Sequence, residues 1–145
     1  MLLIIDMKLV KLAVVAWVAT FGVAYAGEDE DQTPMGREME ASAKALKSLR
    51  KIKKDDWDAM AKAARTAHEA FLKSMAYTPV LIKDMKDGPE KVKALADSRR
   101  LLGLCYAALC ELEIAYLEKD GKKAKELISK WKLLKKEGHT EYSDD

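Results

Sequence analysis

The most informative segment for the fold runs from Pro89 to Lys119 and reads PEKVKALADSRRLLGLCYAALCELEIAYLEK. It is rich in Leu, Ala, Glu and Lys, which favour the α-helix. Its hydrophobic residues recur mostly every three or four positions and make one stripe: Leu95, Leu102, Cys105, Leu109, Leu112 and Tyr116. The central LLGLCYAALC is apolar nearly all round, so we expect it to be deeply buried or to face a second subunit. The segment predicts one long helix over residues 89–119.

The same spacing predicts three shorter helices, over residues 35–54, 57–77 and 122–137. Asp55-Asp56 separates the first two and offers a cap for the second. Thr78-Pro79 ends the second helix, because proline cannot continue a helix. After a longer link, Asp87 is expected to cap the long helix, with Pro89 near its first position. Asp120-Gly121 is expected to turn the chain tightly into the last helix.

Four amphipathic helices with two short links and one longer link predict an all-α fold. We expect an antiparallel up-down-up-down four-helix bundle over residues 35–145. Gly138 is expected to loosen the last turn of the final helix, just before His139.

The first 26 residues have the layout of a secretory signal peptide. From Met7, which fits the start of such a leader better than Met1, two lysines precede an apolar stretch that ends in Ala24-Tyr25-Ala26. The alternative is a single membrane anchor, but the apolar stretch is shorter than the roughly 20 residues that span a bilayer. We expect cleavage after Ala26 and, in a Gram-negative bacterium, a periplasmic protein without stable membrane association. Residues 27–34 then form a short acidic N-terminal segment.

Charge and motif content narrow the function. The 145 residues carry 26 Lys and Arg against 24 Asp and Glu, a net charge of +2, so no strong basic face for nucleic acid is indicated. The sequence has no phosphate loop, nucleophile elbow, CxxC or HExxH, and no paired Glu-x-x-His motifs of a di-metal bundle. We therefore expect no enzyme. The candidate functional side chains are the two histidines, the methionines and the two cysteines.

Met39 and His139 are candidate metal ligands at one end of the expected bundle. On a helical wheel Met39 lies about 20° from Leu46, and His139 lies about 20° from Ile128, so each can face the core. The start of the first helix and the end of the last share one end of such a bundle. A thioether facing an imidazole is an axial pair for haem iron, with the sulfur raising the potential. From the residues alone, Met39 as core filler and His139 in a solvent-exposed tail remain the alternatives.

Three motifs in the same order resemble the cytochrome b562 family. Met39-Glu40 followed by Ala45-Leu46-Lys47 resembles the first helix of that family, which carries the axial methionine within ME-x(5)-LK. Thr78-Pro79 followed by Asp87-Gly88-Pro89-Glu90 is similar to its central linker. Trp131-Lys132 followed by His139-x-x-Tyr142 is similar to its closing segment, where the axial histidine sits.

The resemblance implies a periplasmic four-helix bundle that binds one non-covalent haem b per chain. Met39 and His139 would be the axial ligands of an electron carrier that serves a redox partner protein. The chain departs from the family in Gly138, which replaces a bulky residue, and in a stretch from Gly121 to His139 shorter by about one helical turn. The absence of CxxCH argues against covalent haem attachment.

His68 is the rival ligand, because it lies on the apolar stripe of the second helix and would give bis-imidazole iron with His139. Its depth argues against it: His68 is about 13 Å from its helix end, whereas Met39 is about 6 Å into the first helix. Met75 and Met85 are substitute thioethers. The expected pocket walls are Met35, Ala43, Met75 and Leu104.

A second hypothesis from another class is a haem-free periplasmic bundle with a binding or stress-protective role. The apolar face of the long helix would then be its interaction surface, with a dimer as one form. Cys105 is expected in the core. Cys110 lies on the flank, where an intermolecular disulfide could form in an oxidising compartment.

Overall fold

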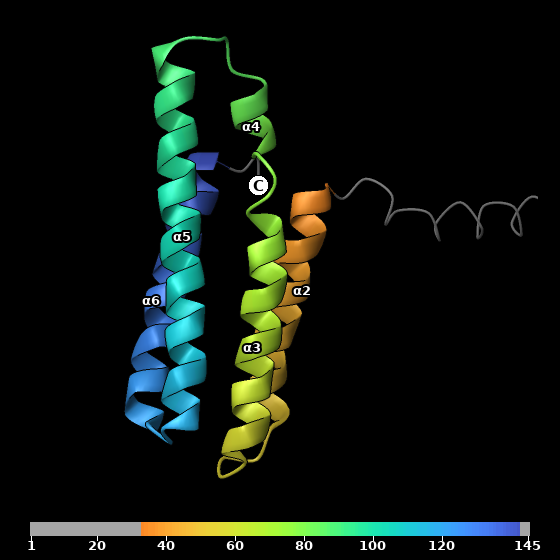
Figure 1. Ribbon diagram of the computed structural model, residues 1–145, viewed down its shortest axis with the longest axis vertical. Helices are drawn as coiled ribbons and strands as arrows, with labels where there is room; N and C mark the ends of the chain where they lie inside the picture. The colour runs from red at the N-terminus through yellow and green to blue at the C-terminus, as the bar shows by residue number, and fades with distance from the viewer. Residues whose placement is uncertain (1–32, 143–145) are drawn as a thin grey trace, which may run out of the picture. The chain divides into compact units, whose positions relative to one another are not determined.

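The structure, a computed structural model, describes residues 33–142 (Figure 1). These residues form α-helices, one 3-10 helix and turns, and no β-strand occurs among them, so the predicted all-α class is confirmed for this range. The predicted signal peptide, the rest of the acidic segment and residues 143–145 lie outside the described residues.

Four long helices correspond to the four predicted ones. They are α2 (Pro34–Ser48, continued by the 3-10 helix η2, Leu49–Lys51), α3 (Trp57–Ser74), α5 (Pro89–Leu117) and α6 (Gly121–Tyr142). The longer link contains the short helix α4 (Val80–Lys83). The described residues include no helix that is both long enough and apolar enough to cross a bilayer.

The long helices pack in chain order. Helix α2 packs along α3, α3 along α5, and α5 along α6, while α4 touches both α5 and α6. Figure 1 shows that the direction alternates from each long helix to the next. The N-terminal end of α2 and the C-terminal end of α6 therefore lie in the same half of the helical unit, as the sequence predicted.

Both α3 and α5 begin where the sequence predicts, at Trp57 and Pro89, but only the expected cap of α3 is confirmed. Asp56 caps α3, since its Oδ1 accepts from the backbone N–H of Ala59 at 3.1 Å. The expected Asp87 cap of α5 is wrong: Gly88 occupies the cap position, with φ of 156°, a conformation that side chains resist. Asp87 instead pairs with Lys91 at 2.9 Å.

The tight turn between α5 and α6 is confirmed. The N–H of Asp120 donates to the carbonyl of Ala115 at 2.8 Å and closes α5, while Asp120 Oδ1 accepts from the N–H of Lys123 at 2.9 Å and caps α6. The residue in the left-handed region is Lys119, at φ 58°. Gly121 lies close to Trp57: a Cβ there would lie 3.3 Å from the ring, a tight contact.

The end of α6 differs from the prediction. The helix continues through Gly138 to Tyr142, so the predicted end at residue 137 is wrong. A contact distant in sequence explains the extra turn: the hydroxyl of Tyr142 donates to Asp97 Oδ2 on α5 at 2.6 Å.

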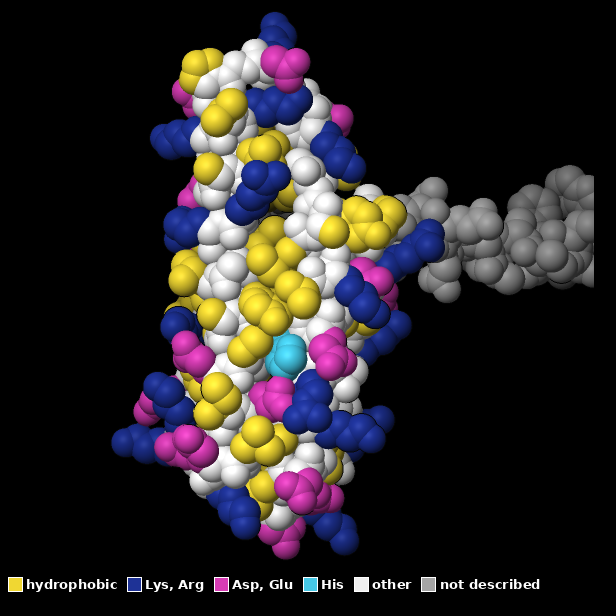
Figure 2. All heavy atoms as spheres, viewed as in Figure 1, with side chains coloured by type: hydrophobic (Ala, Val, Ile, Leu, Met, Phe, Trp, Pro, Cys, Tyr) yellow, Lys and Arg dark blue, Asp and Glu magenta, His cyan; other side chains and the backbone are white. Residues whose placement is uncertain are grey.

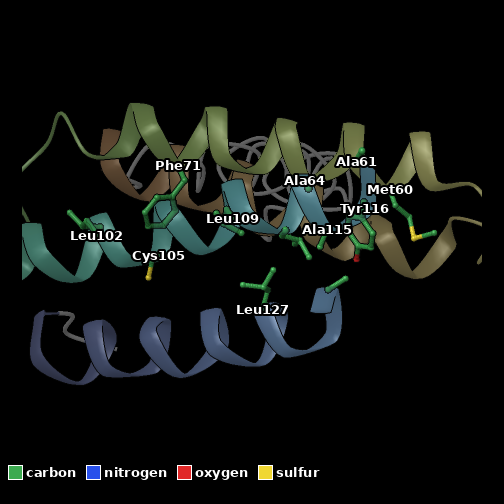
Figure 3. Packing of buried hydrophobic residues seen from close by; sticks show 12 residues of the cluster. Met60, Ala61, Ala64, Phe71, Leu102, Cys105, Leu109, Ala115, Tyr116 and Leu127 are labelled. Atoms are coloured by element: carbon green, nitrogen blue, oxygen red, sulfur yellow. The ribbon is translucent and has the colours of Figure 1, made fainter. Parts of the chain in front are cut away.

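The hydrophobic core is centred on α5. Leu102, Cys105, Leu109, Leu112 and Tyr116 of the predicted stripe are buried. Figure 3 shows labelled side chains of α3, α5 and α6 directed into the space between these helices. Helix α2 is less enclosed: its buried residue is Ser42, and its hydrophobic side chains are half-buried against the core.

Candidate functional site

Met39 lies in the second turn of α2. Its side chain is half-buried and packs against the core cluster, together with Met35 one turn earlier and Leu46 two turns later. The predicted apolar stripe of α2 therefore exists and remains partly open.

His139 lies in the last turn of α6, and its side chain is exposed. The expectation that His139 faces the core is therefore wrong. Around the helix His139 lies about 160° from Glu137, whose Oε1 accepts from Arg100 of α5 at 3.4 Å, and about 60° from Tyr142, which donates to Asp97 of α5 at 2.6 Å. Its imidazole therefore lies on the flank of α6, about 20° from Ile128, which packs against the core.

The two candidate ligands belong to helices that do not pack along each other; among the described long helices, only chain neighbours do so. Half-buried hydrophobic residues of both helices lie against the same core cluster, namely Met35, Met39, Leu46, Ile128, Trp131 and Leu134. We call these six residues the α2–α6 seam. Its members shield the core while keeping part of their own apolar surface exposed.

Gly138 shows that there is room at this end of α6. It follows Trp131 by seven residues and Leu134 by four, so it lies on the same side of the helix as these core-packed side chains. Even so, a Cβ added at Gly138 would meet no atom within 4 Å. One residue before His139, α6 thus presents open space on its inward side.

The chemistry of these residues fits haem b. The thioether of Met39 and the imidazole of His139 belong to two separate helices and lie in the same half of the helical unit. The seam offers apolar walls for a flat macrocycle. Of the other expected walls, Ala43 and Met75 are half-buried, but Leu104 is 39% exposed on α5, so its assignment as a wall is wrong.

A small hollow adjoins the start of α2. It has a volume of about 110 Å³ and is lined by Thr33, Pro34, Met35, Tyr77, Thr78, Val80 and Lys83. Small-molecule pockets usually measure about 300–1,000 Å³, so this hollow is too small for a macrocycle.

His68 is engaged elsewhere. Its Nε2 lies 2.6 Å from Glu113 Oε2, and Glu113 Oε1 accepts from Arg65 Nε at 2.7 Å. The imidazole also meets the ring of Tyr106 edge-on, with centroids 5.9 Å apart. These contacts hold His68 in the interface between α3 and α5, away from the α2–α6 seam. The structure therefore gives no support to His68 as the rival ligand.

The sequence reasoning missed the Arg65–Glu113–His68 cluster. The spacing Arg65-x-x-His68 on one helix, with a single acid on the apolar face of another, was the available signal. Burial would raise the pKa of Glu113, but the hydrogen bonds from Arg65 and His68 outweigh it and hold the pKa below its ordinary value.

The two thiols differ as predicted. Cys105 is buried in the core, and burial raises its pKa to about 11. Cys110 is half-buried on α5. In residues 33–142, no three or more His, Cys, Asp or Glu side chains cluster in a way that could hold a metal ion.

Comparisons of the chain with models of protein families, with curated proteins and with solved structures found no match.

Proposed function

We propose that the four long helices form an up-down-up-down bundle that binds one haem b non-covalently and carries single electrons. Met39 on α2 and His139 on α6 are the axial ligands in this proposal. The observation that carries it is the open space on the inward side of Gly138, next to His139 and on a helix that does not pack along α2.

The chain's own residues would act in three ways. Met39 offers a soft sulfur, which favours the ferrous state, and His139 offers an imidazole nitrogen. The half-buried seam would keep water away from the cofactor. Lys135 lies one turn before His139 on the same side of α6, and its ammonium group would pair with a carboxylate of the haem. When bound, haem iron would supply the one-electron chemistry by alternating between ferric and ferrous states.

The remaining parts of the proposal concern location and partners. The leader ending at Ala26 would export the chain to the periplasm, where an unidentified redox protein would exchange electrons with the haem edge. A non-enzymatic carrier is consistent with the lack of catalytic motifs in the sequence.

The test is an absorbance titration of residues 27–145 with haemin, before and after reduction with dithionite. Saturation at one haemin per chain, with sharp low-spin ferrous bands, is expected. His139→Ala should remove these bands, and Met39→Ala should shift the ferrous spectrum toward five-coordinate iron. Leu49→Ala changes a half-buried residue that packs against the same core beyond the other end of α2, and is the matched control. A spectrum identical to that of free haemin would contradict the proposal.

A haem-free binding module is the second candidate, and one observation favours it. The outer face of α5 exposes Leu104, Ile114 and Leu117 at 39%, 52% and 55%. Figure 2 shows hydrophobic side chains gathered along the face that α3 and α5 present to the viewer. Under this candidate Met39→Ala would only weaken packing, and haemin would not bind.

A further inference from the structure

The last turn of α6 is fastened to α5 by contacts that flank His139 in sequence. On one side Tyr142 donates its hydroxyl to Asp97 Oδ2 at 2.6 Å. On the other side Arg100 Nη2 donates to Glu137 Oε1 at 3.4 Å. Arg100 Nε also donates to Asp97 Oδ1 at 2.8 Å, which joins the two contacts into one network. We call these four residues the α6 clasp.

Asp97 is the centre of the clasp, since each of its carboxylate oxygens accepts one hydrogen bond. An O–H···O⁻ bond of this length to an ionised carboxylate is a strong type of hydrogen bond. The bonds from Tyr142 and Arg100 lower the pKa of Asp97, so the carboxylate stays ionised at neutral pH. Partial burial and the bond to Asp97 raise the pKa of Tyr142 to about 12, so its hydroxyl keeps the proton that it donates.

The last turn of α6 depends on an external hold of this kind. The final carbonyl groups of any helix lack partners within the helix, and helix ends fray. Gly138 adds to the backbone freedom of this turn. The two bonds to α5 lie about 160° from His139 around the helix, at Glu137, and about 60° from it, at Tyr142, so together they fix the direction in which His139 points.

We propose that Tyr142, held by Asp97, is a positioning residue for His139: it fixes the final turn of α6 so that the imidazole is presented to the haem. The role as a ligand support rests on the proposed function. The ordering of the turn does not, because it concerns the chain without cofactor.

The experiment compares wild type with Tyr142→Phe, which removes one hydroxyl and keeps the ring. Glu141→Gln is the matched control, since Glu141 is exposed and lies in the same turn. In the haem-free chain, amide hydrogen exchange is measured for residues 137–142 and for the middle of α6. We expect about tenfold faster exchange in the last turn of Tyr142→Phe, the middle of α6 being unchanged, and no change in the control.

Haemin titration of the same variants tests the second part of the proposal, the role of Tyr142 in supporting His139 as a ligand. We expect Tyr142→Phe to bind haemin about tenfold more weakly and with a larger high-spin fraction, whereas Glu141→Gln keeps the wild-type spectrum. Asp97→Asn should also weaken haemin binding. The double variant of Tyr142→Phe and Asp97→Asn should bind haemin no more weakly than the worse single variant, because both substitutions disrupt the same bond between Tyr142 and Asp97.

The outcomes separate the two proposals. Unchanged exchange in Tyr142→Phe overturns the clasp, whatever haemin does. Faster exchange in a chain that never binds haemin overturns the proposed function and the ligand-support role, and leaves only the ordering of the turn. Faster exchange with unaltered haemin affinity and spectrum overturns the positioning role alone.

Discussion

Nε2 of His68 and Oε2 of Glu113 lie 2.6 Å apart across the interface of α3 and α5, although 45 positions separate the two residues in the chain. Because an ionised carboxylate only accepts, the ring nitrogen facing it carries the proton. Arg65 supplies a further donor to the same carboxylate. One acid therefore links two donors of α3 to the centre of α5.

Replacing Glu113 should destabilise the fold. Glu113→Gln removes the charge that pairs with Arg65 and His68, both held on α3, and we expect the free energy of unfolding to fall by about 1–3 kcal/mol. Urea denaturation measures this change. Glu111→Gln is the control, because Glu111 is an exposed acid of the same helix and should change stability by less than about 0.5 kcal/mol. Equal losses in both variants would contradict a specific role for Glu113.

The same carboxylate makes stability depend on pH. The pKa of Glu113 is lowered in the folded chain, so its contribution is complete above the unfolded value of about 4.3 and is lost as the pH falls through the folded value. We expect the free energy of unfolding to decrease as the pH falls below about 4.5. The decrease should be shallower in Glu113→Gln, although Asp97, whose pKa is also lowered, leaves a residual slope. Parallel curves for the two proteins would refute this assignment.

The sequence predicted the features that depend on neighbouring residues. Hydrophobic spacing located the four long helices, and Asp56 caps α3 as expected. The prediction from the sequence was wrong where a contact between residues distant in the chain determines the structure. Nothing within α6 indicates that the helix passes Gly138, because the cause is the bond from Tyr142 to Asp97.

The candidate site divides in the same way. That Met39 and His139 share one half of the fold follows from helix count and direction. The exposure of His139 depends on how α6 is rotated against α5, which Arg100 and Glu137 help to set. The neighbours of His68 were equally out of reach, since its partner Glu113 belongs to another helix.

The turn between α5 and α6 offers a stabilising substitution. Lys119 adopts φ of 58°, a conformation that costs residues with a Cβ about 1–2 kcal/mol, while glycine adopts it freely. This gain is partly offset, because glycine has more conformational freedom in the unfolded chain. We therefore expect Lys119→Gly to raise the free energy of unfolding by a net amount of about 0.5–1 kcal/mol. Lys125→Gly, in the exposed interior of α6, should lower it by about 1 kcal/mol. Effects of the same sign would contradict the strain at Lys119.

The two cysteines should differ in reactivity. Cys105 is buried, and its pKa of about 11 leaves little thiolate at neutral pH, so a thiol reagent should modify it only when the fold opens. Cys110 is half-buried and should react first. The variants Cys105→Ser and Cys110→Ser assign the fast and slow phases. Under oxidation, a dimer that forms in Cys105→Ser and not in Cys110→Ser would support pairing of two copies through α5.

Gly138 gives the substitution that separates a haem protein from a haem-free bundle. The glycine lies inside α6 and faces open space, so Gly138→Ala should raise the stability of the cofactor-free chain by about 0.5–1 kcal/mol. Gly138→Leu extends a larger side chain into that space, beside His139. If haem occupies the space, Gly138→Leu should weaken haemin binding by about tenfold or more while the cofactor-free chain stays folded, as judged by circular dichroism. Wild-type affinity in Gly138→Leu would mean that haem lies elsewhere, because a leucine and a macrocycle cannot share the volume next to the proposed ligand.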